Sequence, residues 1–245
     1  MHNLLRSKII NIIVIAIMLP SAAFTQLRDN APNLPDHDDK LFHFGINVGA
    51  NRSHYSFAFN PRYISPLNDS ISHVESINST GINLAWLVNM RLGNHLDLRA
   101  YPLDLVFTEK AFQYQLTKPD IIGGEDSTLL KKIQGITLAL PVQLKFSSDR
   151  INNFKVYMMA GGKVEYDFAA NAGKKNEKLI KLSNIDYGIE AGIGFHFYFE
   201  VFVLTPEIKM GYGLKNVHVR DEALKYSNII DKVNSRTLTL SLTVE

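Results

Sequence analysis

Serine and histidine side chains are the residues of this chain whose chemistry is easiest to name. Ser183, combined with His54, His73 or His218, has the residue types of a Ser/His/acid site that hydrolyses lipid esters. Such a site needs a hydrogen bond between nucleophile and base, which spacing alone does not establish. His196 lies in an alternating segment, where a polar histidine is more often a hydrogen-bonded filler than a base. These residues therefore predict no catalytic site.

Metal and phosphate binding have no stronger signal. The acidic segment 36–39 (Asp-His-Asp-Asp) contains metal-ligand types but lacks the spacing of a calcium loop, so a solvated acidic linker is expected. The glycines at 161–162 and 192–194 lie inside strand patterns, not between a strand and a helix, and do not predict a phosphate loop. The chain has no cysteine, which excludes disulfides, thiolate metal sites and a lipid-modified N-terminal cysteine. We predict no catalytic residue, cofactor or metal ion.

The N-terminal residues predict a secretory signal peptide. A cationic start and an apolar segment at 9–19 precede small residues that allow cleavage after Ala23 or Thr25. The apolar segment is about half of the ~20 residues that a spanning helix requires, which disfavours an N-terminal anchor. We therefore predict a signal peptide at 1–25, followed by a periplasmic tether at 26–41.

The exported chain is electrically neutral. Arg6 and Lys8 lie in the leader, and residues 1–26 contain no acid, so 24 of the 26 basic residues remain beside all 24 acidic ones. Balanced charge gives no reason to expect a nucleic acid partner. The hydrophobic share of 46% suits a soluble domain and a barrel with a polar interior equally well, so composition does not choose between them.

Strict alternation of apolar and polar residues recurs along the rest of the chain, which indicates strands with one apolar face. The alternating segments are 42–49, 81–91, 135–146, 154–168, 185–199, 202–214 and 238–244. No position on their apolar faces carries a charge. A surface that faces hydrocarbon explains this pattern, because Lys or Arg at the bilayer midplane costs about 2–4 kcal/mol on a barrel exterior.

Residues 96–116 predict an eighth, less regular strand. Leu98 and Leu103 are both apolar but have opposite parity, so one residue must shift the register near Pro102. Proline lacks a backbone donor and fits a β-bulge there. Pro206 lies in the middle of another alternating segment, and a second bulge is expected at that position.

Short and long connections alternate between these strands. The short turns fall near 93–94, 147–152 and 200–201, and the longer polar segments are 52–80, 117–130, 169–183 and 216–235. This arrangement predicts an all-β protein: an eight-stranded antiparallel up-and-down transmembrane β-barrel at 42–245. Its turns and both termini are expected in the periplasm, and its long loops outside the cell.

A barrel of eight strands is just wide enough for its own side chains to fill. Charged side chains on the inner face must pair, because an unpaired buried charge is strongly destabilising. A salt-bridge network that fills the lumen is therefore expected, in preference to a proton or ligand path. The inward charged residues are Arg91, Lys145, Lys163, Glu165, Asp167, Glu190, Glu207 and Lys209.

Three segments carry a family resemblance: Asn33–Ala50, Gly81–Arg99 and Phe107–Lys110. They resemble the PorT family of outer-membrane proteins from Bacteroidetes, and the similarity runs through the mature chain. The resemblance implies a multi-pass outer-membrane component or accessory of type IX protein secretion, in some species linked to gliding. It implies outer-membrane lipid and other secretion-machinery proteins as partners. The family has no catalytic motif to transfer.

Other functions stay open on the residues alone. A passive structural or adhesive barrel shares every feature above. A lipid-modifying enzyme would depend on Ser183 or His218. A soluble eight-stranded ligand-binding barrel is the weakest alternative, because such folds turn their apolar face inward.

Overall fold

The computed structural model of the chain describes residues 32–59, 71–77, 79–116, 128–170, 180–221, 227 and 230–245. Residues Asn33–Glu245 form one compact unit, distinct from Met1–Pro32. The predicted signal peptide and its cleavage positions lie outside the described residues. Within the described ranges, no helix is long and apolar enough to cross a membrane.

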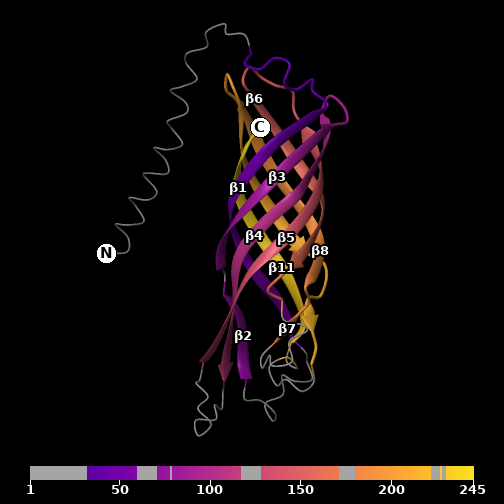
Figure 1. Cartoon of the computed structure of the whole chain (residues 1–245). Helices are drawn as coiled ribbons and strands as arrows, with labels where there is room; N and C mark the ends of the chain where they lie inside the picture. Colours follow the sequence, from indigo (N-terminus) through magenta and orange to yellow (C-terminus); the bar gives the residue numbers. More distant parts are fainter. Residues whose placement is uncertain are drawn as a thin grey trace, which may run out of the picture. The chain divides into compact units, whose positions relative to one another are not determined.

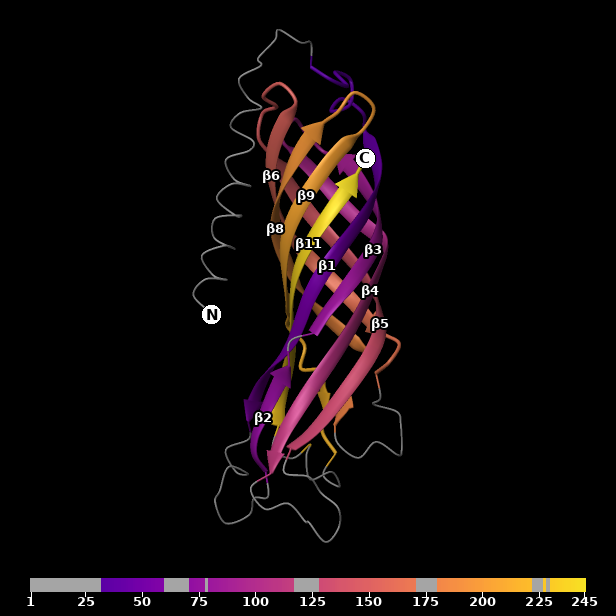
Figure 2. The same cartoon turned by 90° about the vertical axis from the view of Figure 1, so that its left-hand side faces the viewer.

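Eight long strands make up most of this unit. They are β1 (Phe42–Phe59), β3 (Ser79–Arg91), β4 (Leu96–Leu116), β5 (Thr128–Ser147), β6 (Phe154–Asp167), β8 (Ile185–Tyr198), β9 (Val203–Gly213) and β11 (Ile230–Val244). Each pairs antiparallel with the long strands before and after it, and β1 pairs with β11 to close the ring (Figures 1 and 2). The predicted eight-stranded up-and-down barrel is confirmed.

The two ends of the barrel differ. One end carries the turns at 92–95, 148–153 and 199–202, together with the tether at 33–40 and the C-terminal Glu245, and we call it the terminal end. The opposite end is formed by the strand ends at Phe59, Leu116, Thr128 and Ile230, and we call it the loop end. Figure 1 shows the tether in indigo close to the C-terminus.

Apolar side chains point outward and polar ones inward. On β8, Ile189 and Ile193 are 54% and 46% exposed, whereas Asp186 is 8% exposed. The inner face of β11 likewise buries polar side chains, namely Thr239, Ser241 and Thr243. A soluble protein would bury its apolar face, so the predicted assignment of the apolar flank to hydrocarbon is consistent with this geometry.

The register shift expected near Pro102 is present. Trp86 of β3 pairs with Leu103 and Val88 pairs with Ala100, so two residues of β4 oppose Leu87 alone. The β4–β5 ladder breaks at the same point, between Ala100 and Asp104. Because of this bulge, the apolar residues on both sides of Pro102 face outward.

The expectation of a second bulge, at Pro206, is wrong. The pairs Gly194 with Glu207 and Phe197 with Leu204 keep one register through the proline, and no residue is inserted. Pro206 pairs in register with Leu242 on its other side. Its missing donor is accommodated as a gap in the β8–β9 ladder, which leaves the parity of β9 unchanged.

The strands reach further toward the loop end than their polar composition suggested. Residues 52–59, 128–130 and 230–235 were expected in loops, but they extend β1, β5 and β11. The short strand β2 (Ile71–Ile77) also lies in an expected loop and pairs with β4. The two-residue strands β7 (Lys181–Leu182) and β10 (His218–Val219) pair with each other. The strands are longer than expected because these extensions enclose a separate apolar core.

Candidate functional site: a filled lumen and its two closed ends

The lumen holds an ion pair between Arg99 of β4 and Glu207 of β9, toward the terminal end. Arg99 Nη1 donates to Glu207 Oε1 at 2.5 Å, and both side chains are completely buried. The Tyr157 hydroxyl donates to the same Oε1 at 2.5 Å, and the Tyr101 hydroxyl donates to Oε2 at 3.4 Å. Because strands on several sides of the ring satisfy one carboxylate, the pair both fills the lumen and ties its walls together.

Charges of opposite sign alternate around this pair. Glu245 Oε1 also accepts a hydrogen bond from Arg99, at 3.2 Å from Nη2. The Lys209 ammonium lies 4.0 Å from Glu207 Oε2 and 4.5 Å from the centre of the Tyr101 ring. Two cations therefore neutralise two carboxylates where water does not reach, as buried charges require.

A second group of polar contacts lies nearer the loop end. Lys163 Nζ donates to Glu165 Oε1 at 2.6 Å, and the Gln143 side-chain amide donates to Glu190. A Cβ at Gly211 would lie 2.8 Å from Lys163 Nζ. Gly211 thus leaves the space that the lysine head group occupies, which explains one inward glycine.

The expected salt-bridge network is confirmed at five of the inward residues: Lys145, Lys163, Glu165, Glu207 and Lys209. Arg91 differs, because it lies at the terminal end and pairs with Asp39. The buried cation Arg99 was missed. Its neighbours Leu98 and Ala100 alternate as outward residues, and the same alternation would have placed Arg99 inside.

The tether lies across the lumen at the terminal end. The Tyr198 hydroxyl donates to Asp38 Oδ1 at 2.8 Å, and the Lys155 ammonium lies 3.6 Å from Asp38 Oδ2. The Arg150 guanidinium sits 3.7 Å above the centre of the Tyr198 ring and donates to the Leu34 carbonyl at 3.2 Å. The tether therefore closes this mouth, where a cavity of about 20 Å³ remains.

Asp38 anchors the tether electrostatically. Burial alone would raise its pKa. Interactions with His37 and Tyr198 and the positive charge of Lys155 outweigh burial and hold the pKa of Asp38 well below its usual 3.8. The expectation of a solvated acidic linker at 36–39 is therefore wrong for Asp38, because the tether is packed onto the barrel.

One cluster at this mouth combines metal-ligand types. His37, His43 and Glu245 bring candidate ligand atoms within 4.8 Å of one another, and zinc accepts such donors. The same groups already have protein contacts: His43 Nε2 lies 3.2 Å from the Lys40 carbonyl, and Glu245 accepts from Arg99. The centres of the two imidazole rings lie 4.4 Å apart, and the rings are tilted by 38°. We assign the cluster to packing of the tether against β1 and β11.

An apolar core closes the lumen at the loop end. It contains Tyr55, Val74, Tyr114, Ile180, Leu182, Val217, Ile230 and Val233, all buried, with Phe57 and Phe59 packed against it. These residues come from the loop-end parts of β1, β4 and β11, from β2, and from the segments around β7 and β10. Because the inner face changes here from polar to apolar, the core resembles that of a soluble domain and stabilises the extensions by burial.

The structure does not assemble a hydrolase site from Ser183 and His218. The Ser183 hydroxyl donates to the Ile185 carbonyl at 3.1 Å and accepts from Lys215 Nζ at 3.0 Å. His218 Nε2 instead lies 2.8 Å from the Oγ of Ser227, which is completely buried. His218 therefore makes its hydrogen bond within its own connecting segment, and Ser183 does not orient the imidazole.

The other candidate histidines take different places. His196 is buried in the lumen with Nδ1 2.7 Å from Thr205 Oγ1, which confirms the hydrogen-bonded filler. His54 faces outward on β1, and the side chain of His73 lies outside the described residues.

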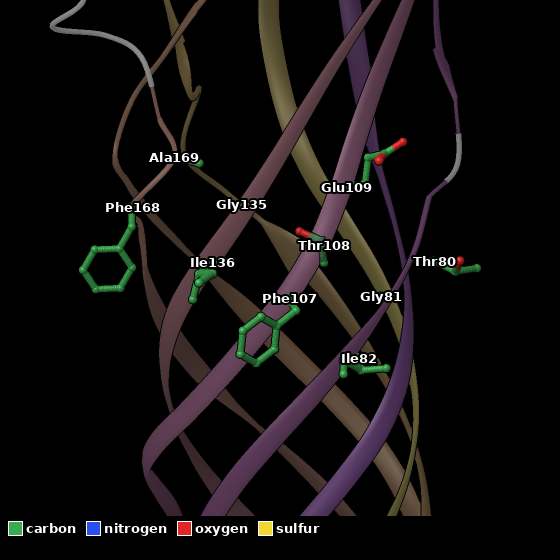
Figure 3. Close-up of a pocket in the computed structure, with 10 residues that line it drawn as sticks. All are labelled: Thr80, Gly81, Ile82, Phe107, Thr108, Glu109, Gly135, Ile136, Phe168 and Ala169. Carbon is green, nitrogen blue, oxygen red and sulfur yellow. The ribbon is translucent and has the colours of Figure 1, made fainter.

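A groove of about 620 Å³ crosses β3, β4 and β5 on the outer face near the loop end (Figure 3). Figure 3 shows Ile82, Phe107, Ile136 and Phe168 around it. The backbones of β3 and β4 approach each other closely at Gly81. A Cβ at this position would lie 2.0 Å from the Phe107 carbonyl oxygen. The groove is largely apolar, as expected for a surface that lipid covers.

A closed ring of strands with an apolar exterior and a paired, charged interior defines an outer-membrane β-barrel protein. The chain belongs to the family described as "Outer membrane protein beta-barrel domain", whose sequence profile matches residues 24–219. Its place is therefore the outer membrane.

Several solved structures are similar to the chain. The Neisserial surface protein A is 12% identical, with 84% of this chain and 99% of that chain covered at a TM-score of 0.42. OprG from Pseudomonas aeruginosa is 12% identical, with 82% and 93% covered at 0.42. Ail, the attachment invasion locus protein of Yersinia pestis, is 13% identical, with 82% and 96% covered at 0.37. No curated protein sequence matches the chain.

Proposed function

We propose that this barrel is a non-enzymatic component or accessory of type IX protein secretion, of the PorT kind. The observation that carries the proposal is the seated tether. Residues 33–50 and 81–99 carry the resemblance to PorT proteins, and at the terminal end Arg91 Nη1 of the second segment donates to Asp39 Oδ1 of the first at 2.9 Å. The segments that carry the resemblance thus meet where the tether closes the barrel.

The filled lumen supports an anchoring role over a conducting one. Arg99, Tyr101 and Tyr157 are less than 3% exposed, so an extended polypeptide has no path at their level. A secretion role would then use the rim, the loops or the outer face to contact other secretion-machinery proteins and outer-membrane lipid. Because the short turns and both ends of the barrel unit lie together, we place the terminal end in the periplasm and the loops outside.

Deletion of the gene tests the role. The expected result is loss of type IX cargo from the culture medium and its accumulation inside the cell envelope, with restoration by the wild-type gene. A passive structural or adhesive barrel predicts normal secretion after deletion. Crosslinking in the native membrane from a residue on the terminal rim, such as Glu200, should capture secretion-machinery proteins.

Orientation has a separate test, because the chain contains no cysteine. A single cysteine at Asp36 should resist a membrane-impermeant maleimide on intact cells and react after the outer membrane is opened. A single cysteine at Asp221, beside β10, should react on intact cells. The reverse pattern would place the loops in the periplasm.

A lipid-modifying enzyme is the second candidate function, favoured only by the 2.8 Å contact between His218 and Ser227. Hydrolysis would require the buried Ser227 to become accessible. The enzyme predicts altered lipid A after gene deletion and in Ser227→Ala or His218→Ala strains. Ser183→Ala should leave lipid A unchanged in every case, since Ser183 does not contact the imidazole.

A further inference from the structure

The outer face carries a compact group of cationic side chains at the loop-end edge of its apolar surface. Arg236 of β11 pairs across strands with Tyr212 of β9 on one side and with His54 of β1 on the other. Arg52 is the next outward residue of β1 and pairs with Leu238. Arg52 and Arg236 are therefore diagonal neighbours, which in a sheet lie about 7–8 Å apart.

No carboxylate neutralises this group within the described part of the chain. Neither Arg52 nor Arg236 takes part in a salt bridge among those residues, and the guanidinium of Arg236 lies 5.1 Å from the centre of the Tyr212 ring. Adjacent like charges repel each other. An anion placed between the two guanidinium groups would therefore stabilise the cluster electrostatically.

The rows on either side show where the cluster lies relative to the bilayer. One outward row nearer the terminal end consists of Ile208, Leu240 and Ala50, all apolar. One outward row nearer the loop end contains Asn234 and Ser56. The cationic row thus marks the boundary between hydrocarbon and head groups, where the available anion is a lipid phosphate.

The cluster also has a shaped surface. Arg52, His54, Arg236 and Tyr212 line a groove of about 500 Å³ whose remaining lining includes Met210 and Leu238. Cations at one side and apolar side chains at the other suit a ligand with a charged head and a hydrocarbon tail. Guanidinium groups bind phosphate oxygens through paired N–H donors, which favours phosphate over other anions.

We propose that Arg52, His54 and Arg236 bind the phosphate of a phosphorylated glycolipid in the leaflet at the loop end, with an acyl chain against Met210 and Leu238. The location of that lipid in the outer leaflet rests on the orientation proposed above. Binding itself does not, so it is measured in detergent, where orientation and secretion have no influence.

The experiment uses the full mature chain refolded in dodecyl maltoside, a detergent without phosphate. Native mass spectrometry and fluorescence titration compare diphosphoryl lipid A, the same lipid after removal of its phosphates, and inorganic phosphate. The variants are Arg52→Gln, Arg236→Gln and Arg236→Lys. Lys232→Gln removes one exposed outward charge from the same strand outside the groove and serves as the matched control. Heat-modified mobility on gels confirms that each variant is folded.

The proposal predicts that the wild-type barrel binds diphosphoryl lipid A about tenfold more tightly than the dephosphorylated lipid. Either glutamine variant should lose most of that difference, and Lys232→Gln should retain it in full. Arg236→Lys should retain only part of it, because the lysine keeps the positive charge but loses the paired N–H donors. Equal binding of the two lipids, or equal binding by wild type and both glutamine variants, would overturn the site. Displacement of the lipid by inorganic phosphate at comparable concentration would identify a free-anion site and overturn the lipid assignment.

Discussion

Arg99 and Glu207 lie 108 residues apart in the sequence and form a completely buried ion pair, with 2.5 Å between Nη1 and Oε1. The pair crosses the lumen from β4 to β9. Its partners are Tyr157 of β6 and Glu245, which directly follows β11, so this group of contacts joins four parts of the ring. The lumen is therefore a structural core built from charges.

Removing one partner of this pair should destabilise the barrel strongly. Glu207→Gln leaves Arg99 with less compensation in a buried place, and we expect a loss of about 3–5 kcal/mol in the free energy of unfolding. Urea unfolding of the refolded protein, followed by far-UV circular dichroism, measures this. Glu200→Gln, at an exposed turn, should change stability by less than about 0.5 kcal/mol. The double variant Arg99→Met/Glu207→Leu should be more stable than Glu207→Gln, and a further loss would contradict the charge-pair account.

Ile193 tests which face of the sheet meets hydrocarbon. It points outward from the middle of β8 and is 46% exposed. Ile193→Arg should lower the free energy of unfolding in lipid bilayers by about 2–4 kcal/mol. Val201→Arg, in a turn at the terminal end, is the matched control and should have little effect. Equal stability of the two variants would contradict a lipid-facing position for Ile193.

The bulge at Pro102 should be required for folding although the proline itself is not. Deletion of Pro102 removes the extra residue of β4 and forces either Arg99 or Asp104 to the lipid side. We expect no heat-modifiable barrel band on gels after refolding. Pro102→Ala keeps the residue count and should fold, because Pro102 is exposed on the outer face. A folded deletion variant would show that the register can be set elsewhere.

Loss of the Asp38 carboxylate should release the tether. Asp38→Asn removes the ion pair with Lys155 and weakens the contact with Tyr198. Together these two contacts stabilise the seated tether by about 1–3 kcal/mol. A cysteine at His37 should then react with a maleimide about tenfold faster in the purified barrel. Asp36→Asn changes an exposed carboxylate in the same tether and should leave the rate unchanged.

The tether should also respond to acid in a defined direction. The pKa of Asp38 is lowered on folding. Its contribution to the stability of the seated tether is therefore fully present above pH 3.8, the usual pKa, and is lost as the pH falls toward the lower folded pKa. A nitroxide attached at position 36 should therefore gain mobility only below about pH 4. In the Asp38→Asn variant the label should be mobile at every pH. A midpoint near pH 6 would instead implicate a histidine.

The local pattern of the sequence determined where the central parts of the eight long strands lie and which of their faces is apolar. The period of two is set by neighbouring residues within one strand, so Ile189 and Ile193 could be placed outward without knowledge of β6 or β9. The same reasoning located the shift near Pro102, because opposite parity on its two sides needs an extra residue.

Only the tertiary structure decided what these strands bring together. The pairing of Arg99 with Glu207 depends on the closure of the ring, and the groove of Arg52 and Arg236 depends on the register between β1 and β11. The seat of Asp38 on Tyr198 joins residues 160 positions apart. Alternation is a local property of the backbone, whereas these contacts follow from long-range register and packing, which no single segment encodes.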